Sequence, residues 1–344
     1  MSAGYQAVHW DRFKKRYDLF LAMGIVSYVA VFVATAFALH PTATPMIVLI
    51  RAFGTAAILQ LHLVLCIGPL ARFDRRWLPL LYNRRHMGVS TFLLALIHGT
   101  LAIQFYHGWS TINPVVSVLV TDSGATFGAF PFQALGLLAL LILFLMAATS
   151  HDFWLANLTA PVWKTLHMGV YVAYGLIVAH VAFGVLQAER SPVYATLMAI
   201  GFVTVAGLHL TAGFRERALD RSQAAPAVGG FVRVCHVDEI ADNRARIVCL
   251  SGERVAVFRY DGKVAAISNV CRHQNGPLGE GKVVDGCVTC PWHGYQYYPD
   301  SGQSPPPFTE RVATYNVKLA NGDVYVDPRP NPAGTKVEAA VIAG

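Results

Sequence analysis

Six long runs of uncharged or nearly uncharged residues constrain this 344-residue chain more than any other feature. A stretch of about 20 apolar residues crosses a bilayer as an α-helix, because a helix satisfies its own backbone hydrogen bonds there. The composition agrees, since 54% hydrophobic residues, 14% charged residues and a mean hydropathy of +0.44 are too apolar for a soluble protein of this size. The runs lie at about 19–39, 46–70, 86–107, 130–150, 163–187 and 193–213.

The first run follows Lys14, Lys15 and Arg16, as the apolar core of a secretory signal would. It is too long for a signal peptide, and no clean cleavage site of the small-x-small kind follows it. We therefore predict a first membrane-spanning helix rather than a signal peptide.

Six spans place both termini on one side of the membrane. The loops on that side carry more Lys and Arg than the opposite loops, which marks them as cytoplasmic. We therefore expect a multi-pass protein of a bacterial inner membrane. Its net charge of +7 reflects its orientation in the lipid bilayer and does not indicate nucleic-acid binding. The basic runs are Lys14-Lys15-Arg16, 72–76, Arg84-Arg85 and Arg215-Arg217-Arg221.

The pattern changes after residue 221. A small-residue linker precedes short alternating segments such as 254–259 and 263–267, which predict strands, and Asp261-Gly262 predicts a hairpin turn between them. The expected fold is a membrane all-α bundle of six helices followed by a small all-β domain. The expected parts are a cytoplasmic segment 1–17, a transmembrane domain 18–214, a linker 215–230, a β domain 231–330 and a flexible tail 331–344.

Two short motifs in the β domain each supply one Cys and one His: Cys271-Arg272-His273 and Cys290-Pro291-Trp292-His293. A [2Fe-2S] centre in which two imidazoles replace two thiolates on one iron needs this donor set. A structural zinc site of the Cys2His2 type is the alternative.

The surrounding segment CRHQNGPLGEGKVVDGCVTCPWHGYQYYPDSGQSPPP resembles the Rieske domain in its ferredoxin-like branch, over 231–328. The resemblance implies that Cys271 and Cys290 hold one iron and that His273 and His293 hold the other. Gly276 and Trp292 stand where Rieske proteins of respiratory bc complexes have a disulfide, which implies a lower potential and suits a reducing compartment.

Of the histidines in the apolar runs, four matter most: His86 and His98 in the third run, and His167 and His180 in the fifth. An imidazole at membrane depth is costly unless it is paired or ligating, so a functional role is the default hypothesis. Within each run the two histidines are about 18 to 20 Å apart along a helix, which predicts two cross-helix pairs at two depths. Two bis-histidine haems would use such pairs, whereas polar core residues are the alternative.

The region of about 45–184 resembles the ferric reductase-like transmembrane domain. The segments that carry the resemblance are RAFGTAAILQLHLVLCIGPLARF, NRRHMGVSTFLLALIHG and WKTLHMGVYVAYGLIVAH. That family includes NADPH oxidases, ferric reductases and the haem subunit of the bacterial methionine sulfoxide reductase system. The resemblance implies one or two b-type haems, preferably two, with His98, His167 and His180 as ligands, whereas His86 departs from the methionine sulfoxide branch. Arg51 either pairs with a haem propionate or extends to the outer interface.

No Gly-x-Gly-x-x-Gly motif follows a strand, so the chain does not take hydride itself. We expect an oxidoreductase that receives electrons from a separate flavoprotein reductase or ferredoxin. They would pass through the cluster and the haems to ferric iron, dioxygen or a periplasmic enzyme at the outer face. The alternatives are a cytochrome b-like subunit of a larger respiratory or photosynthetic complex, and inward transfer to a cytosolic oxygenase.

Overall fold

The structure is a computed structural model of the chain. It describes residues 12–109, 111–119, 132–150, 154, 158, 160–188, 191–221, 230–273, 275–292 and 294–342. The expected N-terminal segment up to residue 11, most of the linker and the ligand candidate His293 lie outside these residues.

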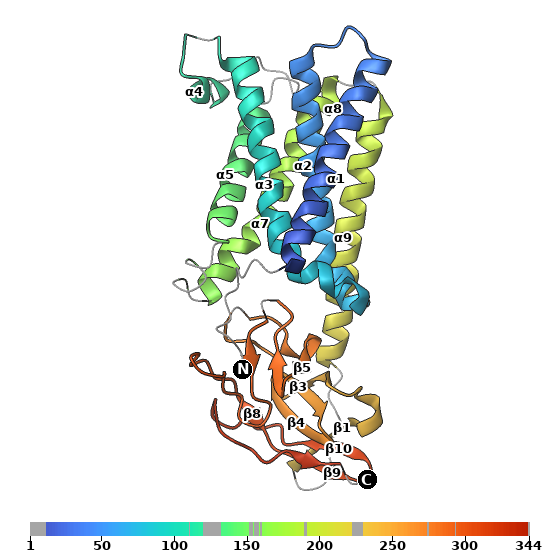
Figure 1. Ribbon diagram of the computed structural model, residues 1–344, viewed down its shortest axis with the longest axis vertical. Coiled ribbons are helices and arrows are strands. Elements are labelled where there is room, and N and C mark those ends of the chain that lie inside the picture. Colours follow the sequence, from blue (N-terminus) through green and yellow to red (C-terminus); the bar gives the residue numbers. More distant parts are fainter. Residues whose placement is uncertain are drawn as a thin grey trace.

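A bundle of long helices forms the first part of the molecule, and the β domain lies at one end of it (Figure 1). The helices are α1 (Arg12–Leu39), α2 (Pro45–Phe73), α3 (Leu78–His107), α4 (Pro114–Leu119), α5 (Phe132–Ala148), α7 (Ala160–Phe183), α8 (Val185–Ala188) and α9 (Pro192–Arg221), with a 3-10 turn η1 (Arg75–Trp77) between α2 and α3. Helices α1, α2, α3, α7 and α9 are long and apolar enough to cross a membrane, and α5 is a shorter apolar helix of 17 residues.

The chain is therefore a multi-pass membrane protein with an all-α part followed by a small all-β domain, as its sequence predicts. The described helices outnumber the expected six because the short helices α4 and α8 lie between the long ones. Helix α9 also continues to Arg221, past the expected end of the transmembrane domain at 214. The end of α9 lies beside the β domain (Figure 1).

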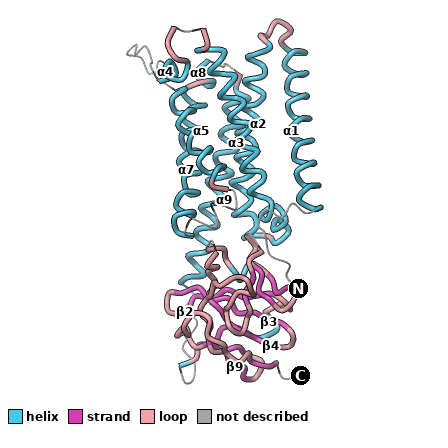
Figure 2. The backbone as a smooth tube through the Cα atoms, turned by 60° about the vertical axis from the view of Figure 1, so that its left-hand side comes forward, coloured by secondary structure: helices cyan, strands magenta, loops and turns pink. Residues whose placement is uncertain are grey.

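Helix α2 is the centre of the bundle. It packs against α1, α3 and α9, while α3 packs against α5 and α5 against α7. Small residues such as Ala52, Ala56 and Ala57 are buried along α2 and allow neighbouring helices to approach closely. Helix α1 is the least enclosed and stands at the edge of the bundle (Figure 2). Its many exposed apolar side chains suit contact with lipid.

The β domain contains three antiparallel sheets. In the first, strand order is β1-β10-β9; in the second it is β11-β4-β3-β2, with β8 also paired to β4; in the third it is β5-β6-β7. The strands are β1 (Val232–His236), β2 (Arg244–Leu250), β3 (Glu253–Tyr260), β4 (Lys263–Ser268), β5 (Lys282–Val284), β6 (Cys287–Thr289), β7 (Gln296–Tyr297), β8 (Thr314–Tyr315), β9 (Val317–Ala320), β10 (Asp323–Val326) and β11 (Ala340–Val341).

The predicted turn between β3 and β4 is confirmed. Tyr260 pairs with Lys263, and the two residues between them, Asp261 and Gly262, have φ values of 45° and 68°. Two positive φ values match the two-residue turn that joins antiparallel strands without splaying them.

The expectation of a loose tail from residue 331 is not met over 331–342. Strand β11 pairs with β4, and Ala339 and Ile342 pack on the two cores of the domain. The apolar residues Ala340 and Val341 form one more short edge strand, which composition alone does not distinguish from a tail.

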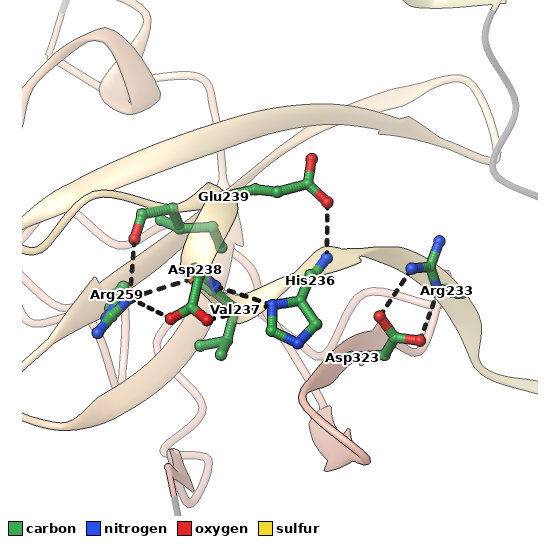
Figure 3. A network of polar contacts seen from close by, with 8 residues as sticks. Arg233, His236, Val237, Asp238, Glu239, Arg259 and Asp323 are labelled. Carbon is green, nitrogen blue, oxygen red and sulfur yellow. Dashed lines mark hydrogen bonds and ion pairs between the residues drawn. The ribbon is translucent and has the colours of Figure 1, made fainter.

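A polar network fixes the entry of the chain into the β domain (Figure 3). Arg233 on β1 donates two hydrogen bonds of 2.7 Å to Asp323 on β10. The backbone N–H of His236 donates to the carboxylate of Glu239, which caps the short helix η4 (Val237–Glu239). Arg259 on β3 reaches the same turn, so β1, β3 and β10 are tied together.

Candidate redox centres

The two Cys-containing loops have the same backbone geometry. In each, the Cys N–H donates to the carbonyl five residues later, and the Cys carbonyl accepts from the N–H four residues later. The residue at that fourth position has a positive φ in both loops. The bonds are Cys271 to Gly276 (2.9 Å), Asn275 to Cys271 (2.7 Å), Cys290 to Tyr295 (2.8 Å) and Gly294 to Cys290 (2.9 Å), with φ of 57° at Asn275 and 72° at Gly294.

The two loops pack closely where Gly276 of the first loop lies against the sulfur of Cys290 in the second. Cys271 and Cys290 are 0% and 1% exposed. A Cβ atom at Gly276 would lie 2.7 Å from Sγ of Cys290, so no other residue fits there without displacing the sulfur. Two buried thiols on twin loops supply the cysteine half of the Cys2His2 donor set of a Rieske-type [2Fe-2S] cluster.

His273 in the first loop is held by an aromatic neighbour. Its ring is parallel to that of Tyr295, at 9° and 4.8 Å between centroids. Tyr295 in turn donates a hydrogen bond to Glu310 and packs against Phe308, just after the proline segment 305–307. The described residues contain no group of three or more His, Cys, Asp and Glu side chains that could hold one metal ion, and His293 is not among them. The fit to a cluster therefore rests on the twin loops.

The hydroxyl of Tyr297 lies 3.4 Å from Sγ of Cys271 and accepts a 3.0 Å hydrogen bond from the backbone N–H of Arg272. Tyr297 is fully buried, and that burial raises the pKa of its phenol. The hydroxyl therefore keeps its proton and can donate it in a hydrogen bond to the sulfur.

In the bundle, His98 on α3 and His180 on α7 face each other. Their ring centroids are 6.3 Å apart and their planes meet at 81°. An imidazole nitrogen binds a metal at about 2 Å, so two rings on opposite sides of one ion have centroids about 6 Å apart. The pair therefore fits a single iron between its rings, as the sequence predicts for a haem.

Both rings are anchored in the same way. Nδ1 of His98 lies 2.9 Å from the Ile50 carbonyl on α2, and Nδ1 of His180 lies 2.7 Å from the Phe132 carbonyl on α5. A carbonyl can only accept, so Nδ1 carries the proton and Nε2 keeps its lone pair for a metal.

A glycine one turn after each carbonyl makes room for the ring. A Cβ atom at Gly54 would lie 2.8 Å from Nδ1 of His98, and one at Gly136 would lie 2.8 Å from Nδ1 of His180. Sequence reasoning missed both glycines. The signal was there, because the two histidines, the two glycines and the two carbonyl residues are each separated by 82 positions.

His86 and His167 lie nearer the β domain but make separate contacts. Nδ1 of His86 is 2.7 Å from the Asp18 carboxylate on α1. Nδ1 of His167 is 3.0 Å from the Trp163 carbonyl, its Nε2 is 3.5 Å from the Ser150 hydroxyl, and its ring stacks on Trp163. No direct contact joins the two rings among the described residues. In both, Nδ1 is anchored in the manner of a metal-bound histidine.

Two other histidines of the bundle, His107 and His62, have their ring nitrogens engaged differently. His107 uses both nitrogens, with Ser117 at 2.9 Å and Gln133 at 2.8 Å. Nε2 of His62 lies 3.0 Å from the Tyr174 hydroxyl. These contacts describe polar residues satisfied inside the bundle. Arg51 has an exposed side chain on α2, next to the Ile50 carbonyl that anchors His98.

Comparison with known proteins identifies both parts. Residues 53–178 match the family model described as the ferric reductase like transmembrane component, and residues 230–316 match that of the Rieske [2Fe-2S] domain. The chain is 34% identical over 100 residues to the biphenyl dioxygenase ferredoxin subunit of a Pseudomonas species, covering 28% of this chain and 91% of the relative.

Two further relatives are similar over the same part. The 3-phenylpropionate/cinnamic acid dioxygenase ferredoxin subunit of Photorhabdus laumondii is 34% identical over 95 residues, covering 27% of this chain and 90% of the relative. Among solved structures, the ferredoxin of carbazole 1,9a-dioxygenase from Nocardioides aromaticivorans shares 26% identity over 29% of this chain and all of that chain, with a TM-score of 0.28.

Proposed function

We infer a role in electron transfer, because the chain joins a ferric reductase-like transmembrane domain to a C-terminal Rieske [2Fe-2S] domain. We propose that single electrons pass between the cluster and membrane haems and then to an acceptor at the outer face. The parts that suit this role are a membrane part that ends with helix α9 at Arg221 and a Rieske part that runs from β1 to β11 and so includes residues 331–342. The observation that carries the proposal is the facing pair His98 and His180, with both Nδ1 atoms anchored and both rings at the spacing for one iron.

The Rieske loops would hold the first redox centre of this path. Cys271 and Cys290 would hold one iron, and His273 and His293 the other. When bound, the cluster accepts and releases one electron at a time. The protein's part is to bury the sulfur atoms, fix the two loops by their matching hydrogen bonds, and place the Tyr297 hydroxyl beside Cys271.

The helix bundle would hold the next two redox centres, which are haems. His98 and His180 would hold an outer haem, and His86 and His167 an inner one closer to the Rieske domain. Asp18 and the Trp163 carbonyl then orient the inner ligands, while Arg51 would pair with a propionate of the outer haem. About 21 Å of helix separate Arg84, at the Rieske end of α3, from His98. An inner haem would therefore divide a long electron-transfer distance into two shorter steps.

The bias of Lys and Arg supports a Rieske domain in the cytoplasm of a bacterial cell, with the haems leading outward. A flavoprotein reductase or a ferredoxin would then be the donor. Ferric iron, dioxygen or a periplasmic enzyme would be the acceptor, which makes the chain an oxidoreductase that depends on a donor protein.

Optical and paramagnetic resonance spectra of the purified full chain test the proposal. We expect a Rieske signal together with haem bands equal to two haems per chain. Replacing His98 and His180 with alanine should remove about half of the haem absorbance and leave the Rieske signal. Unchanged haem bands in that double variant, or zinc in place of iron, would contradict the proposal.

Inward transfer is a second candidate, favoured by the similarity of the Rieske part to dioxygenase ferredoxin subunits. In that case the cluster would pass electrons from the haems to a cytosolic oxygenase. A redox titration separates the two directions, because inward transfer requires a cluster potential above those of both haems.

A further inference from the structure

Trp292 of the second ligand loop packs against the membrane helices. Its indole lies on an apolar cluster formed by Ile67 and Ala71 of α2 and Leu81 of α3. The guanidinium of Arg84, one turn further along α3, lies 5.9 Å from the centre of the Trp292 ring. That distance is within the range of a cation–π contact.

The same indole also covers the first ligand loop. A Cβ atom at Gly276 would lie 3.2 Å from the Trp292 ring and 2.7 Å from Sγ of Cys290. Trp292 and Gly276 occupy the two positions where Rieske proteins of bc complexes are expected to have a disulfide. Here the two loops are joined by packing instead, and the packed side chain reaches the bundle.

A second contact fixes the domain beside this one. Glu216, near the end of α9, forms an ion pair with Arg254 on β3. Both side chains are largely enclosed, at 22% and 35% exposure, so the pair is less screened than an ion pair in open solvent. Because α9 is continuous from the membrane to Arg221, the ion pair ties the sheet to a rigid element.

We propose that the ligand-loop tip of the Rieske domain, residues 271–273, 275–277, 290–292 and 294–295, is permanently docked on α2 and α3 of its own chain through Trp292. A soluble electron donor then binds another face of the domain. This deepens the proposed function, on which it rests, by naming the membrane domain as the redox partner of the tip. The apolar contact supports permanent docking. If the Trp292 indole moved away from Ile67, Ala71 and Leu81, apolar surface would be exposed to water on both the indole and the helices, which is unfavourable.

Cross-linking of the full chain in lipid nanodiscs tests this directly. Cysteines at the ion pair, Glu216→Cys with Arg254→Cys, are treated with a short bis-maleimide before and after reduction with dithionite. We expect at least tenfold more intramolecular cross-link than in either single variant, and the same yield in both redox states. A yield that falls to the single-variant level in either state would overturn permanent docking.

A second substitution tests the docking of Trp292 without touching the ligand loops. Leu81→Asp in the double-cysteine background should lower the cross-link yield at least fivefold while the Rieske signal persists. Val341→Asp is the matched control, because Val341 is 68% exposed on β11. An unchanged yield with Leu81→Asp would overturn the role of Trp292. If the cross-link forms as expected but the haems are not reduced by the cluster, docking stands and the proposed electron path fails.

Discussion

At the scale of single residues, the clearest consequence concerns the Tyr297 hydroxyl beside Cys271. A hydrogen bond donated to a cluster sulfur stabilises the reduced, more negative state, and such bonds help set Rieske potentials. Tyr297→Phe removes a bond worth about 1 kcal/mol, which corresponds to a potential lower by about 40 mV for one electron. A redox titration followed by paramagnetic resonance measures it.

The matched control for this change is Tyr298→Phe, because Tyr298 is the next residue and its side chain is 40% exposed. Its cluster potential should stay at the wild-type value. A Tyr297→Phe potential equal to or above wild type would mean that the hydroxyl does not donate to the cluster sulfur.

The glycines that lie against His98 and His180, the proposed haem ligands, yield a second prediction at this scale. Gly54→Val or Gly136→Val places a side chain where the ring of His98 or His180 lies, so the pair can no longer close on one iron. Each variant should lose about half of the haem absorbance per chain. Gly207→Val on α9 is the control, because no atom beyond its chain neighbours and the backbone of its own helix lies within 4 Å of the position its Cβ would take. Full haem content in both glycine variants would refute the assignment.

The histidines themselves could be predicted from sequence, but their surroundings could not. An imidazole inside an apolar run stands out because its burial is costly, and depth along the helices together with the family resemblance singles out His98 and His180 as candidates. The carbonyls of Ile50 and Phe132 leave no trace in side-chain chemistry. Gly54 matters only because a neighbouring helix brings a ring within 2.8 Å, which is a property of tertiary packing.

At the scale of elements, local rules worked where the chain makes local contacts. The Asp261-Gly262 turn was predicted because its two positive φ values favour these residue types. The length of α9 and the pairing of β11 were not predicted, because both depend on contacts between distant segments. Helix α9 extends to meet β3 through Glu216, and β11 needs the exposed edge of β4.

The docking of elements also determines a pH response. Glu280 ends the short helix η5 (Leu278–Glu280), and burial raises the pKa of its carboxyl to about 7, while nearby Glu216 adds to the rise and Arg72 and Arg254 oppose it. A raised pKa means that the folded protein binds the proton more tightly than the unfolded chain. The contribution to stability is therefore full below about pH 4.5 and is lost as the pH rises to 7.

Glu280→Gln keeps the neutral form at every pH and tests this sign. We expect the variant to lose its cluster at a higher temperature than wild type at pH 8, with a gain of at most about 3 kcal/mol, and to match wild type at about pH 4. Thermal loss of the Rieske signal measures it. Glu338→Gln, at an exposed position, should change neither curve. A variant less stable than wild type at pH 8 would show that the carboxylate is favourably paired.

At the scale of the whole molecule, the proposed order of redox centres, from cluster to inner haem to outer haem, predicts how far an electron travels in a variant. The Rieske tip contacts the end of α3 that carries His86, whereas His98 lies twelve residues further into the bundle. If the outer pair is lost, an electron from the cluster can still reach the inner haem but not the outer face. The His98→Ala, His180→Ala double variant should therefore keep a reducible inner haem.

Proteoliposomes with the Rieske domain outside and ferricyanide trapped inside measure this. In wild type, reduction of the cluster should bleach the trapped ferricyanide, because electrons leave at the far end of the bundle. The double variant should reduce one haem per chain at a similar rate and bleach ferricyanide at least a hundredfold more slowly. His107→Gln is the control, since both nitrogens of His107 are held by Ser117 and Gln133. Bleaching at the wild-type rate in the double variant would mean that electrons bypass the His98 and His180 pair, and the order of redox centres would be wrong.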